Sequence, residues 1–565
     1  MTNQTGADGS ARPPAGAFPI AHRLLRGYAP AAVLVLVVAL IALLVPSRVS
    51  KNANAATGGG GPSIGQSTGP TGGTAGGAAG AAGAGTAGSA GSAGRSATAG
   101  SAGGTATLPG HTAACSGQAL QVPGDPYSPP CITFAGANGG ATATGITGTD
   151  INVSVRLTTD QSFQQTLATL AGAQLRDTNA DNQRTILALA QYFNTHFQFY
   201  GRKINIKFFT GQGSLGNELQ GYGQANAVVD AKTAQSNGVF ADLSAESEPY
   251  ATALWNNGIL GFGDPYMPNS WHQQHAPYDW SLATDGTDLA TGIANYTVQK
   301  LCPQGTPAAY AGGSLKGAPR KFAGIAPQNE LYQASAGVFK QVLNAHGCSV
   351  DNFQYALDLG TESQQAANLV AQLKSGGYTT ILCGCDPIFP VYLSGQAAQQ
   401  GYFPEFVEIG AALVDQDYVG QLYNQQFYAH AFGISPNLAT VPYTQTIGYA
   451  AYKTVRQDEP AFFVDIIYLQ MEMLAIGIQM AGPTLTAATY QAGMFAYPPR
   501  LGPAGLWGFN TNQHTIPNDF REVCWSPSTV SPNNNKAGAY NQTSNQRWTE
   551  NNVPAGPPGC PIPSG

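Results

Sequence analysis

Short polar segments follow several of the predicted strands, and their residue types could bind a small ligand. Ser244, Ala245 and Glu246 follow a predicted strand at 238–243 and precede a predicted helix at 250–257. A hydroxyl group beside free backbone N–H groups at such a turn can bind an anion, and the same hydroxyl can instead cap the helix. The sequence leaves these two interpretations open.

Two aspartates occupy similar positions, each directly before a proline. Asp264 follows a predicted strand at 259–263, and Asp386 follows a predicted strand at 379–383. An Asp-Pro step after a strand is usually a turn or a helix cap. In a sheet of parallel strands, both carboxylates would also project into a cleft at the carboxyl ends of the strands.

Patterns typical of enzymes and of metal or cofactor sites are weak in this chain. The glycines at 211–216 match a dinucleotide-binding fingerprint, but more glycines follow where a helix should begin. His272 and His275 have a spacing that metal sites use, as do Cys383 and Cys385, but no carboxylate is spaced to complete either set. We therefore expect no bound metal, no cofactor and no catalytic residues.

The elements that must position the polar segments alternate between strand and helix. Strands are expected at 151–156, 204–210, 238–243, 259–263, 322–326, 379–383 and 406–409, and helices at 182–200, 225–235, 250–257, 289–301, 331–346, 363–374, 391–400 and 462–480. Such alternation predicts parallel sheets with helices on both faces. This part of the chain is too long for one sheet, so we expect two α/β lobes with a ligand cleft between them.

Composition excludes other classes of protein. The chain has 565 residues, of which 10% are charged and 43% are hydrophobic, and its net charge is −6. A nucleic-acid-binding protein would be more basic, and an intrinsically disordered chain would hold fewer hydrophobic residues. We therefore expect no nucleic-acid partner.

The N-terminal region predicts attachment to a membrane. Residues 28–46 are apolar and uncharged, and at about 1.5 Å per residue such a helix just spans a bilayer. A short basic stretch at 1–27 precedes it, so we expect a cytoplasmic tail, an uncleaved anchor and a globular body outside the cytoplasm. A cleaved signal peptide is the alternative, because Ala53 and Ala55 could form a cleavage site. Residues 47–107, rich in Gly, Ala and Ser, predict a flexible tether.

All eight cysteines follow the apolar segment, which suggests disulfide bonds in an oxidising compartment. One sequence does not determine connectivity, and Cys383 and Cys385 are left open. Our hypothesis pairs the other six as Cys115–Cys131, Cys302–Cys348 and Cys524–Cys560.

Five stretches together resemble a known family. They are 145–157 (GITGTDINVSVRL), 237–247 (NGVFADLSAES), 256–266 (NNGILGFGDPY), 321–343 (KFAGIAPQNELYQASAGVFKQVL) and 375–410, which begins SGGYTTILCGCDP. In order and loop character they resemble the type I periplasmic-binding-protein family, in its branch of Leu/Ile/Val-binding-like substrate-binding proteins of ABC transporters. The resemblance implies an α/β fold of two Rossmann-like lobes joined by a three-strand hinge, with crossings near 283–288, 433–437 and 496–505.

The resemblance also implies domain boundaries. They are a disulfide-containing extension at 108–144, lobe 1 at 145–286 with about 438–500, lobe 2 at 287–436 with about 501–530, and a Pro/Asn-rich tail at 531–565.

Ligand-binding residues follow from the same comparison. In relatives, a ligand carboxylate binds the loop that Ser244 and Ala245 match here, and the next such loop corresponds to Asp264. Tyr332 matches a tyrosine that stacks on the ligand from lobe 2, and Asp386 matches a later loop that faces the ligand.

One departure from the family concerns the acid that pairs with the ammonium group of an amino-acid ligand. That position falls near Gly410 and Ala411, and Glu408 lies two residues earlier. The departure puts an amino-acid ligand in doubt and leaves the fold untouched.

The resemblance favours a monomeric, membrane-tethered solute-binding protein on the extracytoplasmic side. It would deliver a small polar ligand, such as an amino acid, an amide or a related compound, to an ABC permease. The alternative is a membrane-tethered ligand sensor or surface interaction protein that has the same fold and no permease. An enzyme is a third, weaker interpretation.

Overall fold

The computed structural model describes residues 115, 117–158, 165–166, 177–263, 266–303, 306–544 and 546–563. All of them belong to one unit of the chain, Ala102–Gly565. The expected N-terminal tail, anchor and tether lie outside the described residues, and so does Asp264.

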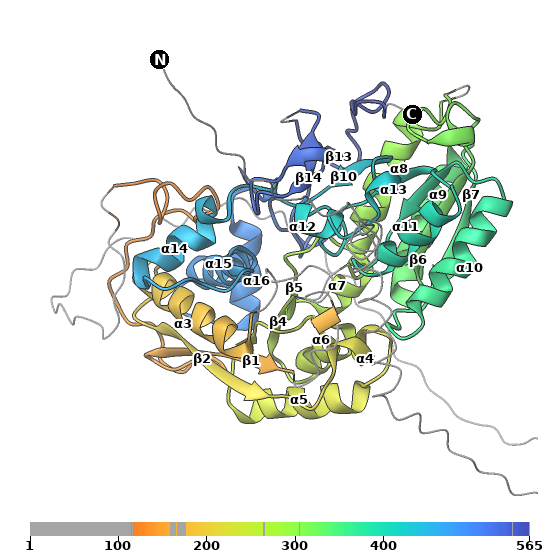
Figure 1. The fold of residues 1–565 in the computed structure, drawn as a ribbon. Helices are drawn as coiled ribbons and strands as arrows, with labels where there is room; N and C mark the ends of the chain where they lie inside the picture. Colours follow the sequence, from red (N-terminus) through yellow and green to blue (C-terminus); the bar gives the residue numbers. More distant parts are fainter. Residues whose placement is uncertain are drawn as a thin grey trace, which may run out of the picture. The chain divides into compact units, whose positions relative to one another are not determined.

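The first sheet has five parallel strands in the order β2-β1-β3-β4-β5 (Figure 1). The strands are β1 (Asp150–Leu157), β2 (Lys203–Thr210), β3 (Ala241–Asp242), β4 (Leu260–Phe262) and β5 (Asp279–Trp280). Ile151, Val153 and Val155 of the interior strand β1 are all buried. Branched apolar residues suit an interior strand because side chains on both its faces meet packed neighbours.

Helices from two distant parts of the chain accompany this sheet, and we call the sheet with these helices lobe 1. The earlier helices are α3 (Asn179–His196), α4 (Leu215–Leu219), α5 (Gln224–Ser236), α6 (Glu248–Asn256) and α7 (Asn269–His275). The later elements are the 3₁₀ turn η3 (Tyr443–Gln445) and helices α14 (Ile447–Val455), α15 (Val464–Ala481) and α16 (Ala487–Ala496). Figure 1 shows α14, α15 and α16 beside α3, and α3 contacts both α14 and α15.

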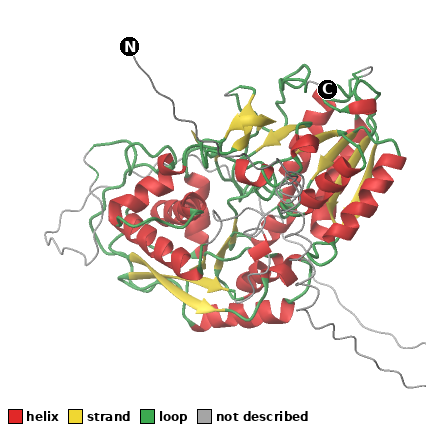
Figure 2. Ribbon diagram, in the orientation of Figure 1, coloured by secondary structure: helices red, strands yellow, loops and turns green. Residues whose placement is uncertain are grey.

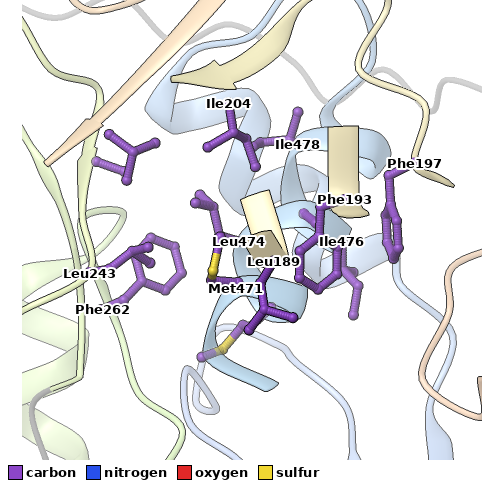
Figure 3. Packing of buried hydrophobic residues seen from close by; sticks show 14 of the residues in the cluster. Leu189, Phe193, Phe197, Ile204, Leu243, Phe262, Met471, Leu474, Ile476 and Ile478 are labelled. Carbon is purple, nitrogen blue, oxygen red and sulfur yellow. The ribbon is translucent and has the colours of Figure 1, made fainter. Parts of the chain in front are cut away.

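The central helix of lobe 1 is α15, and its apolar side chains hold the two parts together. Met471, Leu474 and Ile476 of α15 are fully buried in one cluster with Leu189 and Phe193 of α3 (Figure 3). Among the described residues, α15 is the one helix long and apolar enough to cross a membrane. Because 67% of its apolar window is buried within the fold, core packing explains its composition.

The second sheet has seven strands in the order β14-β13-β10-β9-β8-β6-β7. Figure 2 shows strands in yellow and helices in red. The strands are β6 (Phe322–Pro327), β7 (Val350–Tyr355), β8 (Thr380–Cys383), β9 (Glu405–Glu408), β10 (Ala431–Ser435), β13 (Arg521–Val530) and β14 (Ala537–Gln542). Strands β6 to β10 pair in parallel, whereas β13 pairs antiparallel to both β10 and β14. The mixed α/β fold with parallel sheets is therefore the fold class expected from the sequence.

We call the second sheet and its helices lobe 2. The helices are α8 (Gly286–Lys300), the 3₁₀ turn η2 (Gly313–Leu315), α9 (Glu330–Ala345), α10 (Glu362–Ser375), α11 (Phe389–Gln399), α12 (Asp417–Gly420) and α13 (Gln425–Tyr428). The segment expected to be a C-terminal tail, 531–565, supplies β14 at the edge of the sheet. It also returns to the sheet through Cys560, which is bonded to Cys524 of β13.

The chain passes between the lobes in three crossing segments: from β5 to α8, from β10 to α14, and from α16 to β13. The third includes a small hairpin of β11 (Arg500–Gly502) and β12 (Gly505–Trp507). The first and third lie side by side, because Thr284 Oγ1 donates to the carbonyl oxygen of Pro517 at 2.8 Å. Arg521 Nε donates to the carbonyl oxygen of Asn437, in the second crossing segment, at 3.0 Å.

Disulfide bonds connect all eight cysteines in the structure. Three of the four pairs are those of our hypothesis, Cys115–Cys131, Cys302–Cys348 and Cys524–Cys560. The fourth joins Cys383 to Cys385, the two cysteines that the sequence left open.

The α3 helix offers a matched test of the lobe 1 core. Leu189 is fully buried, whereas Leu187, two residues earlier, is 51% exposed. We predict that Leu189→Ala lowers the free energy of unfolding by about 3 kcal/mol, because it leaves a cavity in the core. Leu187→Ala should change it by less than about 0.5 kcal/mol. Urea denaturation followed by circular dichroism measures both, and equal losses would contradict the packing described here.

Candidate ligand-binding cleft

A cleft of about 660 Å³ is lined by residues from both lobes. Glu246, Gly263 and Tyr266 reach it from loops that follow strands β3 and β4 of lobe 1. Residues at the carboxyl ends of β6, β8 and β9 line it from lobe 2. The cleft is therefore at the carboxyl ends of both sets of parallel strands, where α/β proteins bind their ligands.

A second, smaller cavity of about 270 Å³ adjoins the crossing segments. Glu246, Gly263 and Tyr266 line both cavities, so the two adjoin at this edge of lobe 1. Leu282 and Asn437 of the crossing segments line the smaller one.

The residues expected to bind ligand are distributed unevenly around the cleft. Tyr332 and Asp386 line it. Ser244 and Ala245 are buried and belong to the lining of neither cavity. Asp264 lies outside the described residues, although its neighbour Gly263 lines the cleft.

The Ser244 loop is closed by its own hydrogen bonds. Ser244 Oγ donates to Asp242 Oδ1 at 2.6 Å and accepts from the backbone N–H of Arg156 at 2.7 Å. The backbone N–H of Ala245 donates to the carbonyl oxygen of Phe262 at 3.1 Å. These two groups are satisfied within lobe 1, so they offer no free donor to an anion. Helix α6 begins after Ser247, whose hydroxyl also makes no capping bond.

A buried ion cluster explains the glycine-rich segment at 211–216. Arg156 forms ion pairs with Glu218 at 2.8 Å and with Asp230 at 3.3 Å. Asp230 in turn accepts from the backbone N–H groups of Gln212 at 2.7 Å and Gly213 at 2.9 Å. A Cβ atom on Gly213 would lie 2.2 Å from Glu218 Oε1, so glycine is required there for close packing.

Asp386 serves both of the roles that the sequence suggested. Its Oδ1 accepts from the backbone N–H groups of Ile388 at 2.7 Å and Phe389 at 3.2 Å, at the start of α11. Its Oδ2 accepts from the hydroxyl of Tyr355 at 2.7 Å. These bonds favour the ionised carboxylate and offset part of the burial that raises its pKa. Asp386 thus caps a helix and also lines the cleft.

Glu362 lines the cleft and was not identified from the sequence. It is the first residue of α10, and acidic residues are common in the first turn of a solvent-exposed helix because they interact favourably with the helix dipole. In the structure it is only 1% exposed, and its Oε2 has no hydrogen-bond partner. Burial, with the negative charges of Asp386 and Asp358, raises the pKa of Glu362 to about 9. Glu362 therefore keeps its proton at neutral pH.

The expected absence of a metal site can be examined for the described residues. These contain no group of three or more His, Cys, Asp or Glu side chains that could hold a metal ion. His272 Nδ1 pairs with Asp279, and His275 Nδ1 bonds the carbonyl oxygen of Trp271 at 2.7 Å, so each histidine has a structural partner. Cys385 lines the cleft as part of its disulfide bond.

No protein-family model and no curated protein sequence matches the chain. Solved structures do match: a leucine-, isoleucine-, valine-, threonine- and alanine-binding protein from Brucella ovis has 12% identity and a TM-score of 0.51, covering 72% of this chain and 98% of its own. A substrate-binding protein of an ABC transporter from Aeropyrum pernix has 13% identity and a TM-score of 0.50, covering 71% and 96%. An amino acid ABC transporter substrate-binding protein from Pseudomonas fluorescens has 12% identity and a TM-score of 0.50, covering 72% and 96%.

These comparisons define the fold. The described body has the fold of ABC-transporter substrate-binding proteins of the Leu/Ile/Val-binding type, which confirms the resemblance seen in the sequence. The first of these proteins is described as an amino-acid-binding protein and the other two as substrate-binding proteins of ABC transporters.

The buried proton on Glu362 predicts a pH dependence of stability. Between about pH 5 and pH 9 the unfolded chain loses this proton while the folded chain keeps it, so the free energy of unfolding falls as pH rises. Glu362→Gln should flatten this fall by up to about 1.4 kcal/mol per pH unit. Urea denaturation at several pH values measures the slope. Glu330→Gln, at an exposed acid outside the cleft, is the control and should leave the slope unchanged.

Proposed function

We propose that this protein is the solute-binding component of an ABC transporter and holds a small organic molecule between its two lobes. The observation that carries the proposal is the cleft itself, which both lobes line at the carboxyl ends of their parallel strands. The fold shared with solved substrate-binding proteins supports it.

The mechanism follows from contacts on both sides of the cleft. A ligand held between Glu246 and Tyr266 of lobe 1 and Tyr332 and Asp386 of lobe 2 gains most when the lobes close on it. Ligand binding therefore shifts the population toward the closed form by its differential affinity for that form. The crossing segments act as the hinge, because they are the places where the chain passes between the sheets.

The position of the protein in the cell belongs to the same proposal. The apolar segment at 28–46 would anchor the chain, and the segment at 47–107 would tether a monomeric body outside the cytoplasm. The closed, loaded body would then meet a permease in the same membrane. Four disulfide bonds fit an oxidising compartment.

A thermal-shift screen of the full chain tests solute binding. The panel holds amino acids, amides, small carboxylates, amines, purines and sugars. A ligand at 100 times its dissociation constant should add about 2.7 kcal/mol of stability and raise the Tm by several degrees. Tyr332→Ala should abolish the shift because Tyr332 lines the cleft, while Tyr222→Ala, at a 65% exposed tyrosine outside the cleft, should keep it. A flat response to the whole panel would contradict transport and favour a tethered sensor or interaction protein.

A further inference from the structure

Among the acidic and basic residues that the structure describes in the cleft lining, all are acids. Glu246, Asp358, Glu362 and Asp386 line it, and the lining residues that the structure describes include no lysine, arginine or histidine. Most of the remaining lining side chains are apolar or aromatic. A ligand carboxylate would therefore meet only negative charge, whereas a ligand cation would be attracted.

The loop at Ser244 to Glu246, which was expected to bind a ligand carboxylate, also disfavours an anion. The hydroxyl of Ser244 and the backbone N–H of Ala245 are both engaged inside lobe 1. The next residue, Glu246, is exposed and lines both cavities, so this loop presents a carboxylate where relatives present donors. The arrangement disfavours amino acids and other acids as ligands.

Glu362 provides a second, independent observation. Its side chain is 99% buried by the fold, lines the cleft, and leaves Oε2 without a hydrogen bond. A buried carboxyl oxygen without a partner is unfavourable, and a ligand that donates a hydrogen bond there relieves the penalty. Asp386, whose carboxylate is already bonded to three donors, supplies negative charge beside it.

The rest of the cleft suits an apolar body attached to such a donor. Tyr266, Tyr332, Phe339 and Phe353 line it, and aromatic rings attract cations as well as apolar groups. A volume of about 660 Å³ lies within the range of pockets that hold drug-sized molecules.

We propose that the cleft binds a protonated amine with an apolar body and no carboxylate, whose ammonium group donates to Glu362 beside Asp386. The inference rests on the proposed function, because it names the class of solute for the same cleft. The ammonium group would supply both the donor that Glu362 lacks and the counter-charge that the lining lacks.

Three probes with one phenylpropyl body test the charge preference: 3-phenylpropylamine, 3-phenylpropan-1-ol and 3-phenylpropanoate. Isothermal titration calorimetry on the full chain at neutral pH should show the amine binding at least about tenfold more tightly than the alcohol, with the carboxylate weakest. Equal affinities, or a preference for the alcohol or the carboxylate, would overturn the amine proposal.

Variants connect the preference to the named residues. Glu362→Gln keeps the size of the side chain and replaces a carboxyl group, which can give up its proton beside a bound ammonium group, with an amide that cannot. The amine should therefore lose about tenfold in affinity while the alcohol is unchanged. Glu246→Gln alters an exposed side chain that lines the cleft, and it should weaken the amine and strengthen the carboxylate. Glu459→Gln, on the exposed surface outside both cavities, should leave all three affinities unchanged.

The outcomes separate this inference from the proposed function. If the amine fails to bind while another compound of the thermal-shift panel binds in a Tyr332-dependent way, the amine class is wrong and solute binding stands. If neither the probes nor the panel bind, both proposals fail. If Glu362→Gln weakens the amine and the alcohol equally, the ammonium contact is wrong.

Discussion

The cleft depends on hydrogen bonds that hold three crossing segments together between two separate sheets. Arg521 and Arg547 donate to backbone carbonyl oxygens at 436–438, and Thr284 and Asp285 bond the segment at 515–517. Backbone polar groups in these segments belong to neither sheet and would otherwise lack partners where they are buried. These hydrogen bonds join the crossing segments to one another and to their immediate neighbours, so they hold the two sheets on opposite sides of the cleft. Each lobe retains its own hydrophobic core.

Two clusters of buried acids, one in each lobe, differ in whether a cation lies beside them. In lobe 1 the guanidinium of Arg156 forms ion pairs with both Glu218 and Asp230 and also lies 3.7 Å from the centre of the Tyr250 ring. That cluster holds the glycine-rich loop at 211–216 in place. In lobe 2 the Glu362 and Asp386 pair faces the cleft without a cation among the described lining residues. Burial of unbalanced acids is unfavourable, so this corner is where a bound molecule gains most.

Local patterns predicted most elements but not their pairing. The helix expected at 331–346 is α9 at Glu330–Ala345, because apolar spacing and a stopping glycine are visible in the sequence. Strands β13 and β14 add an antiparallel edge that no neighbouring residues reveal, since β13 pairs with a strand about 90 residues earlier. Only part of the cleft lining could be predicted from the sequence. Tyr332 and Asp386 line the cleft, whereas the burial of Glu362 and the engagement of Ser244 depend on tertiary partners.

The two ends of the described chain are fastened to different lobes. Near the start, Gln479 of α15 donates to Gln121 at 3.1 Å, and the Cys115–Cys131 bond closes this segment on itself beside lobe 1. Near the end, Cys560 is bonded to β13 of lobe 2, and Tyr310 donates to its carbonyl oxygen at 3.0 Å. A mechanical pull between the ends would therefore pass through the hinge and not through either core. Tension between the two ends would favour the open form of the cleft, and a ligand bound to both lobes would oppose that opening.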